Sequence, residues 1–475
     1  MTETIRKYLR DMPLLMMGLC LAVFAPLQGR AETLADALVG AYTHSGLLEQ
    51  NRALLRAADE DVALAMSALR PIVSWSAGFE QNSSNSRLDF PGSILTSSNS
   101  SNFDVRLTAE ILLYDGGSSK LAVEAAKETV LATRYGLLSI EQDVFLRAVN
   151  AFFGVISAVE FVDIAQNSQR LLTEELQAAQ DRFDVGEVTR TDVAQAESRL
   201  AAARSTLARA RGNLFIAQEE YRNVIGRAPG QLIAPSRLPT ARSDVEAAKL
   251  QAVRSHPDML QVQRQIAATE LNILRAEANM RPVVSLDGTL LANEDVSSRQ
   301  YNQAGVVGLR LRQTIYGGGA LTSSVRQASA SRDAARGNLH RVRHDIQQDV
   351  GNALAQRVVA RAALEASEQQ IVAARIAFSG IQEEATLGAR TTLDVLNAEQ
   401  ELLDAEAERI SAQSEESIAA YAVLASLGSL TAEQLNLPVE RYDPAAYYNL
   451  VKDAPVARSK QGRQLDKVLR ALGKE

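Results

Sequence analysis

Two copies of one short polar motif hold the residues whose types and spacing could do chemistry. "VGEVTRTDV" at residues 185–193 recurs as "LGARTTLDV" at residues 387–395. A threonine followed three residues later by an acid caps the start of a helix, and a glycine supplies the left-handed turn that ends one. Each copy therefore predicts a tight corner between two helices, with a carboxylate at its surface. The matching residues are Gly186, Thr189 and Asp192 in the first copy and Gly388, Thr391 and Asp394 in the second.

Other reactive patterns are weak. His340 and His344 have the i, i+4 spacing of metal ligands on a helix. Arg341 and Arg343 lie between them, and no acidic third ligand falls on the same face within a turn, so we expect solvated helix surface. No Ser/His/Asp arrangement and no catalytic pair of carboxylates stands out in the sequence. It therefore favours a protein that is not an enzyme and that uses no cofactor and no metal.

The composition favours long helices over a large globular core. Only 5% of the 475 residues are aromatic, while alanine is abundant, and alanine suits helices that pack closely. The formal net charge is -7, whereas nucleic-acid-binding proteins usually show a basic footprint. We therefore expect no nucleic-acid partner.

Residues 1–31 have the pattern of a cleaved secretory signal peptide. Three basic residues precede an apolar run at residues 12–27, and cleavage is expected after Ala31. An uncleaved membrane anchor is the alternative. The single cysteine, Cys20, lies inside the signal, so the mature chain has no thiol and suits an oxidising compartment.

The chain contains two internal repeats, each marked by the same two short motifs. "LRPIVSW" at residues 69–75 recurs as "MRPVVSL" at residues 280–286, and "LLYDGG" at residues 112–117 recurs as "TIYGGG" at residues 314–319. Internal self-similarity of this kind indicates a repeated structural unit. The predicted units are a first repeat at 32–230, a second repeat at 231–436 and a C-terminal tail at 437–475.

Two segments of each repeat alternate apolar and polar residues, which predicts strands with one apolar and one polar face. The Ser/Asn-rich residues 81–102 between the first two segments predict a surface loop. A soluble sheet lying on a core and a membrane β-barrel both fit the alternation, but four strands cannot close a transmembrane barrel alone. The apolar positions are Val73, Trp75, Ala77, Phe79, Phe103, Val105, Leu107, Ala109, Ile111, Val284, Leu286, Leu290, Val307, Leu309 and Leu311.

From Gly117 to Phe183 the sequence contains almost no helix breaker. One helix of this length would span roughly 100 Å at about 1.5 Å per residue. The second repeat contains a similar long stretch with almost no helix breaker. In both stretches apolar residues recur at three- and four-residue spacings, as in coiled coils. Such helices need neighbours of equal length, from the same chain and from other copies.

Together these features resemble the TolC family of outer-membrane efflux and type I secretion channels. The resemblance rests on the doubled corners, the Arg-Pro before each first strand and the "LLYDGG" and "IYGGG" strand exits, and it covers residues 33–430. It implies a mainly α fold in the cell outer membrane, built as a homotrimer. Three chains, each giving four strands, would share a twelve-stranded transmembrane β-barrel joined to a long α-helical coiled-coil barrel in the periplasm.

The family also implies a function and partners. Such a channel passes small molecules or unfolded protein outward from an inner-membrane pump of the ABC or RND type, through a periplasmic adaptor (membrane fusion) protein. The rival interpretation is a periplasmic coiled-coil adaptor or scaffold protein without a pore. The tail either wraps the equator of the helical cylinder or is disordered. Outer-membrane lipid is expected to contact Val105, Leu107, Leu286 and Leu309.

The resemblance places the two corners at the periplasmic end of the cylinder, where the channel is gated. Thr191, Asp192, Arg390 and Asp394 would form this gate, with Arg390 bonded to Thr191 or Asp192 to keep it closed. Three copies of an aspartate around a narrow pore concentrate cations. Helix capping alone is the other interpretation of both aspartates.

Two positions depart from the family pattern. Ala385 stands where a closing tyrosine is expected, and Asn397 stands where a second acidic ring is expected. Both departures predict a gate that opens more easily and prefers cations less strongly. The turn residues expected to contact the adaptor are Gly186, Thr189, Gly388 and Thr391.

Overall fold

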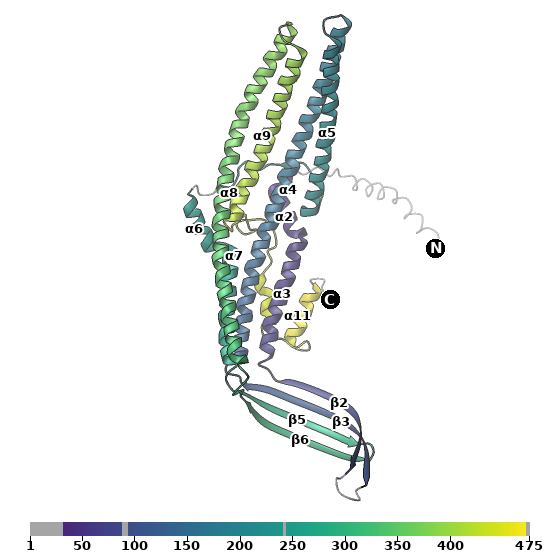
Figure 1. Cartoon of the computed structure of the whole chain (residues 1–475), viewed down its shortest axis with the longest axis vertical. Coiled ribbons are helices and arrows are strands. Elements are labelled where there is room, and N and C mark those ends of the chain that lie inside the picture. The colour runs from purple at the N-terminus through teal and green to yellow at the C-terminus, as the bar shows by residue number, and fades with distance from the viewer. Residues whose placement is uncertain (1–31, 88–93, 241–243, 472–475) are drawn as a thin grey trace, which may run out of the picture.

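The structure is one elongated molecule with long helices at one end and a β-sheet at the other (Figure 1). It is a computed structural model that describes residues 32–87, 94–240 and 244–471. The predicted signal peptide lies outside the described residues.

Two helices of 67 residues each set the length of the molecule, α4 (Ser118–Asp184) and α8 (Ala320–Thr386). Each begins after a glycine with a left-handed backbone, Gly117 with φ 92° and Gly319 with φ 86°. Neither helix contains a proline, so no residue inside it lacks the N–H that the helical hydrogen bonds need. The uninterrupted helix predicted from Gly117 to Phe183 is confirmed.

Shorter helices pair along these two. The helices α5 (Arg190–Ile225) and α9 (Thr392–Ser426) return from the far ends of α4 and α8, while α3 (Gly46–Ser67) and α7 (Pro257–Ala278) lie nearer the sheet (Figure 1). Because α4 also packs on α7 and α9, the two repeats form one body. The remaining small elements of this part are β1 (Glu32–Thr33), α2 (Leu34–His44), β4 (Leu232–Ile233) and α6 (Val245–Ser255).

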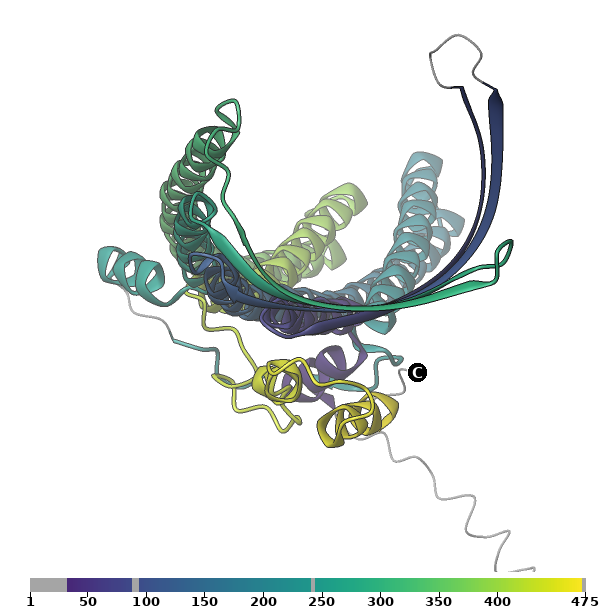
Figure 2. The same cartoon turned by 90° about the horizontal axis from the view of Figure 1, so that it is seen from below.

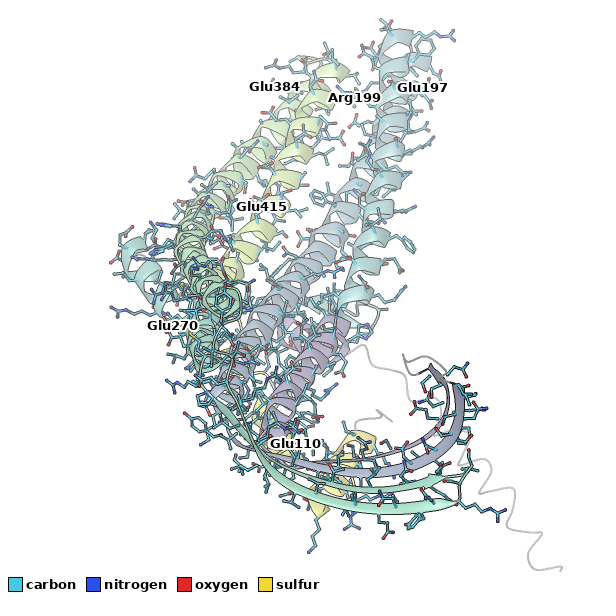
Figure 3. The ribbon with its side chains drawn as sticks, turned by 60° about the horizontal axis from the view of Figure 1, so that its bottom comes forward. Glu110, Glu197, Arg199, Glu270, Glu384 and Glu415 are labelled. Atoms are coloured by element: carbon cyan, nitrogen blue, oxygen red, sulfur yellow. The ribbon has the colours of Figure 1, made fainter. Side chains whose placement is uncertain are left out.

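The helices and the sheet curve in the same sense. Seen from below, the long helices form an arc, and the sheet bends along it like a sector of a barrel wall (Figure 2). The sheet is antiparallel in the order β2-β3-β5-β6. Glu110 of β3 lies near the end of the sheet that joins the helices (Figure 3). The strands are β2 (Ile72–Arg87), β3 (Leu95–Tyr114), β5 (Val283–Asp295) and β6 (Gln300–Arg312).

The predicted apolar face of the sheet is continuous across the four strands. Leu107 pairs with Trp75 on one side and Leu290 on the other, and Leu286 pairs with Leu309. This face covers no core in the single chain, since Trp75 is 74% exposed and Leu309 is 68% exposed. The soluble alternative, with its apolar face on a core, is therefore wrong.

The predicted Ser/Asn-rich loop at residues 81–102 is largely wrong. Strand pairing continues through most of it, as far as the pair Arg87 and Leu95, and the connecting residues 88–93 lie outside the described residues. The serines and asparagines there give no apolar side by which a strand could be recognised. Backbone hydrogen bonds pair the two strands in this region, so the first hairpin is longer than the second.

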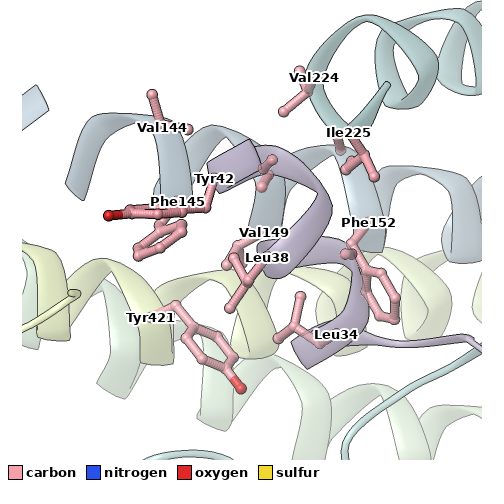
Figure 4. Close-up of a cluster of buried hydrophobic side chains, with 14 of the residues drawn as sticks. Leu34, Leu38, Tyr42, Val144, Phe145, Val149, Phe152, Val224, Ile225 and Tyr421 are labelled. Atoms are coloured by element: carbon pink, nitrogen blue, oxygen red, sulfur yellow. The ribbon is translucent and has the colours of Figure 1, made fainter. Parts of the chain in front are cut away.

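The main hydrophobic core lies midway along the molecule, where α2, α4, α5 and α9 meet (Figure 4). Phe145, Phe152 and Tyr221 are fully buried there. The Tyr221 hydroxyl donates a 2.6 Å hydrogen bond to Glu32, the first described residue, and so fixes β1 to this core. One stretch of α4 is long and apolar enough to cross a membrane, but half of it is buried, as in the core helix of a soluble domain.

The C-terminal tail is folded. It forms α10 (Pro444–Val451) and α11 (Lys460–Ala471), and Figure 2 shows both on the convex side of the arc. The Tyr447 hydroxyl donates a 2.6 Å hydrogen bond to Glu60 of α3, and Val451 is fully buried beside it. Of the two alternatives for the tail, disorder is therefore wrong for the described residues.

Candidate gate at the helical tips

The two corners lie at the end of the molecule farthest from the sheet (Figure 1). We call residues 185–192 the first tip and residues 387–394 the second tip. Gly186 has φ 82° and Gly388 has φ 77°, so both glycines supply the left-handed turn that was predicted. Placing a side chain at either position would strain this turn.

Both predicted capping boxes are present. The Asp192 carboxylate accepts a 2.8 Å hydrogen bond from the Thr189 N–H, and the Asp394 carboxylate accepts one of 3.0 Å from the Thr391 N–H. In return each threonine side chain accepts from the backbone of its aspartate. Each tip therefore starts its returning helix with donors that are satisfied on both sides.

Both tip aspartates are held in the ionised form. Hydrogen bonds from the side chain and backbone of Thr189 lower the pKa of Asp192. Hydrogen bonds from the backbone and then the side chain of Thr391 do the same for the pKa of Asp394, with a smaller contribution from Arg390. Each tip therefore contains one aspartate that stays ionised at neutral pH.

Arg390 has a different partner from the one predicted. Its Nε donates a 2.8 Å hydrogen bond to Glu384, which belongs to the last turn of α8 on the same tip. The ion pair spans the turn and holds the second tip to its own helix. The bond from Arg390 to Thr191 or Asp192 stays a prediction for the assembled channel.

A separate contact joins the two hairpins one turn inside the tips. The Nη2 of Arg199 on α5 donates a 3.0 Å hydrogen bond to the Oδ1 of Asn397 on α9. Four apolar side chains from three helices pack beside it. We call this contact the tip seam; it consists of Leu172, Arg199, Leu200, Ala203, Leu396 and Asn397.

Glu399 lies against the tip seam with almost no contact with water. Its side chain is only 3% exposed, and its Oε1 has no hydrogen-bond partner among the described residues. Burial raises its pKa to about 7 from an ordinary 4.5, Glu175 of α4 adds to the rise, and Arg199 opposes it. A proton therefore binds and leaves Glu399 near neutral pH.

Sequence reasoning did not assign a role to Glu399. The sequence could have predicted its burial. Leu396, Glu399 and Leu403 share one apolar stripe of α9 at spacings of three and four. The equivalent position of the first repeat, Glu197, is exposed. The two glutamates differ in burial only because α4 and α5 pack over the stripe that contains Glu399.

An open cavity of about 530 Å³ runs along α4, α5 and α9 directly beneath the tip seam. Glu399, Ser168 and Phe161 are among its lining residues. Side chains of both hairpins line this cavity, so it separates part of α9 from α4 and α5 next to the tip seam. Farther down, Arg409 of α9 forms an ion pair of 3.4 Å with Glu160 of α4.

In the part of the chain that the structure describes, the two histidines with metal-ligand spacing in the sequence do not belong to a cluster of possible metal ligands. Among the described residues, no group of three His, Cys, Asp or Glu side chains could hold a metal ion. His340 and His344 are both exposed on α8, as expected for solvated helix surface.

Comparisons with known proteins agree with this architecture. The family described as outer membrane efflux protein matches residues 41–227 and 250–429. Outer membrane efflux protein BepC of Brucella suis biovar 1 (strain 1330) is 32% identical, over 89% of this chain and 91% of that protein. Outer membrane protein TolC of Escherichia coli (strain K12) is 24% identical, over 89% of this chain and 87% of that protein. The crystal structure of the Campylobacter jejuni CmeC outer membrane channel aligns with a TM-score of 0.74 at 17% identity, over 89% of this chain and 90% of that one.

Proposed function

The chain belongs to the outer membrane efflux protein family, that of TolC, and is an outer-membrane channel protein with a periplasmic helical part; we propose that it is the exit channel of a tripartite efflux or type I secretion system. In this role it receives small molecules or unfolded protein from an inner-membrane pump. It then passes them to the outside without chemical change.

The curved sheet is the observation that carries this proposal. Its apolar face is exposed, and its edge strands β2 and β6 have no partner strand among the described residues. Lipid can cover the apolar face, and neighbouring chains can pair with the two edges. Three copies would give twelve strands, enough for a water-filled barrel.

The helices extend this conduit into the periplasm. Helices of 67 residues would reach roughly 100 Å from the membrane. In a homotrimer the three arcs would close into a cylinder whose far end carries six tips. An adaptor of an ABC or RND pump would meet the channel there, at the turns formed by Gly186, Thr189, Gly388 and Thr391.

The gate would be set by the tip charges and by the tip seam. Asp394 and Asp192 supply fixed negative charge, and Arg390 would hold neighbouring tips together next to Thr191. The tip seam would decide whether the two hairpins of one chain move as a unit. Opening would then separate the α8–α9 hairpin from the α4–α5 hairpin above the cavity.

Fractionation and conductance together test the proposed function. The mature protein should partition with the outer membrane, migrate as a trimer in mild detergent and form cation-selective channels in planar lipid bilayers. A protein that purifies from the periplasm as a soluble monomer and forms no channels would instead be an adaptor or scaffold.

A further inference from the structure

The C-terminal tail carries a basic surface next to the sheet, and we propose that this surface binds the anionic phospholipid headgroups of the periplasmic leaflet of the outer membrane. We define the basic tail segment as residues 455–471, the bend after α10 together with α11. The proposal rests on the proposed function, because it requires the sheet to lie in the membrane.

The bend is fixed at the sheet end of the helices. Arg70 donates a 2.7 Å hydrogen bond to the carbonyl oxygen of Ala454 and a second one to the carbonyl oxygen of Asp453. Arg70 lies two residues before Ile72, where β2 begins. The tail is therefore held where the chain passes from the helices to the sheet.

The helix α10 makes this attachment firm. The guanidinium of Arg134 on α4 lies 5.2 Å from the centre of the Tyr448 ring. Arg52 of α3 lies between the rings of Tyr42 and Tyr442, 4.8 Å from the first centre and 5.5 Å from the second. Together with the Tyr447–Glu60 hydrogen bond, these contacts hold the tail against α3.

The bend combines apolar and basic residues. Val456 is 68% exposed, and Ala457 next to it is exposed as well. Arg458 and Lys460 follow directly and are also exposed. Exposed apolar residues directly next to bases are the combination found on surfaces that lie at the headgroup level of a membrane.

The helix α11 continues this pattern. Leu465 and Leu469 pack against Tyr447 and Val451, so its apolar stripe is used within the chain. The opposite side presents its charges to solvent. The basic tail segment holds five bases and one acid, a local charge of 5 - 1 = +4 in a chain of net charge -7; they are Arg458, Lys460, Arg463, Asp466, Lys467 and Arg470.

Location and charge together favour lipid over other acidic partners. Val73 and Trp75, both exposed, begin the apolar face of β2 just beyond the Arg70 anchor. A bilayer around that face would bring its headgroups next to the basic tail segment. Anionic headgroups attract clustered Lys and Arg side chains near a membrane surface.

A fluorescent reporter in the bend tests the proposal. Trp75 is the only tryptophan, so the full chain with Trp75→Phe and Val456→Trp carries one reporter. The trimer is inserted into nanodiscs of phosphatidylcholine, with or without phosphatidylglycerol, that contain a headgroup-level quencher. We expect quenching at least about twofold stronger in the anionic discs, falling as salt screens the charges.

Two triple variants separate this surface from overall charge. Arg458→Glu, Lys460→Glu and Arg463→Glu together should abolish the extra quenching. The matched control, Arg204→Glu, Arg211→Glu and Arg361→Glu, changes the net charge equally at exposed positions of α5 and α8 and should keep it.

Three outcomes would decide against the proposal or its basis. Inserted trimers that show equal quenching in both kinds of disc would overturn it. Suppression of the quenching by soluble peptidoglycan fragments, with no effect of phosphatidylglycerol, would assign the surface to the cell wall instead. Failure of the protein to enter discs at all would refute the proposed channel rather than the tail inference.

Discussion

Arg199 and Asn397, which stand 198 positions apart in the chain, are joined by a 3.0 Å hydrogen bond from the Arg199 Nη2 to the Asn397 Oδ1. The bond links the two hairpins of one chain just inside their tips. Asn397 stands where the family pattern led us to expect a second acidic ring. The amide oxygen of Asn397 instead bonds α9 to α5. The residue that replaces the expected acid therefore makes a contact between the two hairpins.

Removing this bond should make the gate easier to open. Arg199→Ala loses a charge-assisted hydrogen bond worth about 1 kcal/mol per chain, and in the proposed trimer three copies would act on one pore. We expect higher single-channel conductance in planar bilayers with normal trimer yield. Arg204→Ala, at an exposed position of α5 outside the tip seam, is the control and should leave conductance unchanged.

The tip seam should loosen as pH rises through neutrality. The pKa of Glu399 is raised to about 7 from 4.5, so the folded chain holds the proton more tightly than the unfolded chain. The cost of burying the ionised form is absent below pH 4.5, grows from there to about pH 7 and is complete above it. At about 1.4 kcal/mol per pKa unit, the upper limit of this cost is about 3.5 kcal/mol per chain.

Glu399→Gln should abolish this pH dependence. Conductance of the unmodified channel is expected to rise between pH 5.5 and 8.5, while that of the variant stays at the low-pH value. Asp192 and Asp394 cannot cause the change, because their lowered pKa values keep both ionised throughout that range. A pH response that survives in Glu399→Gln would place the titrating group elsewhere.

Arg390→Ser should raise conductance without lowering trimer stability. The structure adds a way to find out which bond matters. If the ion pair with Glu384 alone keeps the gate closed, Glu384→Gln should raise conductance equally. If Arg390 reaches Thr191 or Asp192 of a neighbouring tip in the trimer, Glu384→Gln should instead leave conductance low. Unchanged conductance in Arg390→Ser would remove Arg390 from the gate.

Asp394→Asn should reduce cation selectivity, measured as the reversal potential under a salt gradient. The amide keeps one oxygen to accept from the Thr391 N–H, so the cap is weakened rather than lost. Asp404→Asn, on the exposed side of α9 below the tip, is the control and should preserve selectivity. If selectivity is unaffected in Asp394→Asn, this aspartate is a helix cap and nothing more.

Leu107→Arg should block assembly of the barrel. A charge near the bilayer midplane costs about 2–4 kcal/mol on a lipid-facing position. Thr108→Arg places the same side chain on the opposite face of β3 and should be tolerated. Trimer yield in detergent extracts of the outer membrane provides the measurement, and equal yields from both variants would contradict the assignment of the faces.

Local features of the fold could be predicted from the sequence, and contacts between distant segments could not. The caps at Thr189 and Thr391 follow from residues three positions apart, so sequence alone identifies them. The partner of Arg390 depends on how the last turn of α8 presents Glu384, which no spacing rule gives. Glu399 resembles any solvated glutamate of a coiled coil until α4 and α5 cover it. The strand residues between Gln81 and Arg87 lack an apolar side, so only backbone pairing reveals them.

The edge strands β2 and β6 make the unassembled protomer the hazardous form of this protein. Each edge is a row of free donors and acceptors that any extended polypeptide can extend. In the proposed trimer both edges would be paired only after copies meet, so the rate of assembly would rise steeply with the number of chains in the periplasm. Wrong pairing into open-ended aggregates would rise with it. Overproduction should therefore be toxic at levels where each molecule on its own is perfectly folded. Folding helpers that shield single strands, rather than those that repair cores, should set the yield.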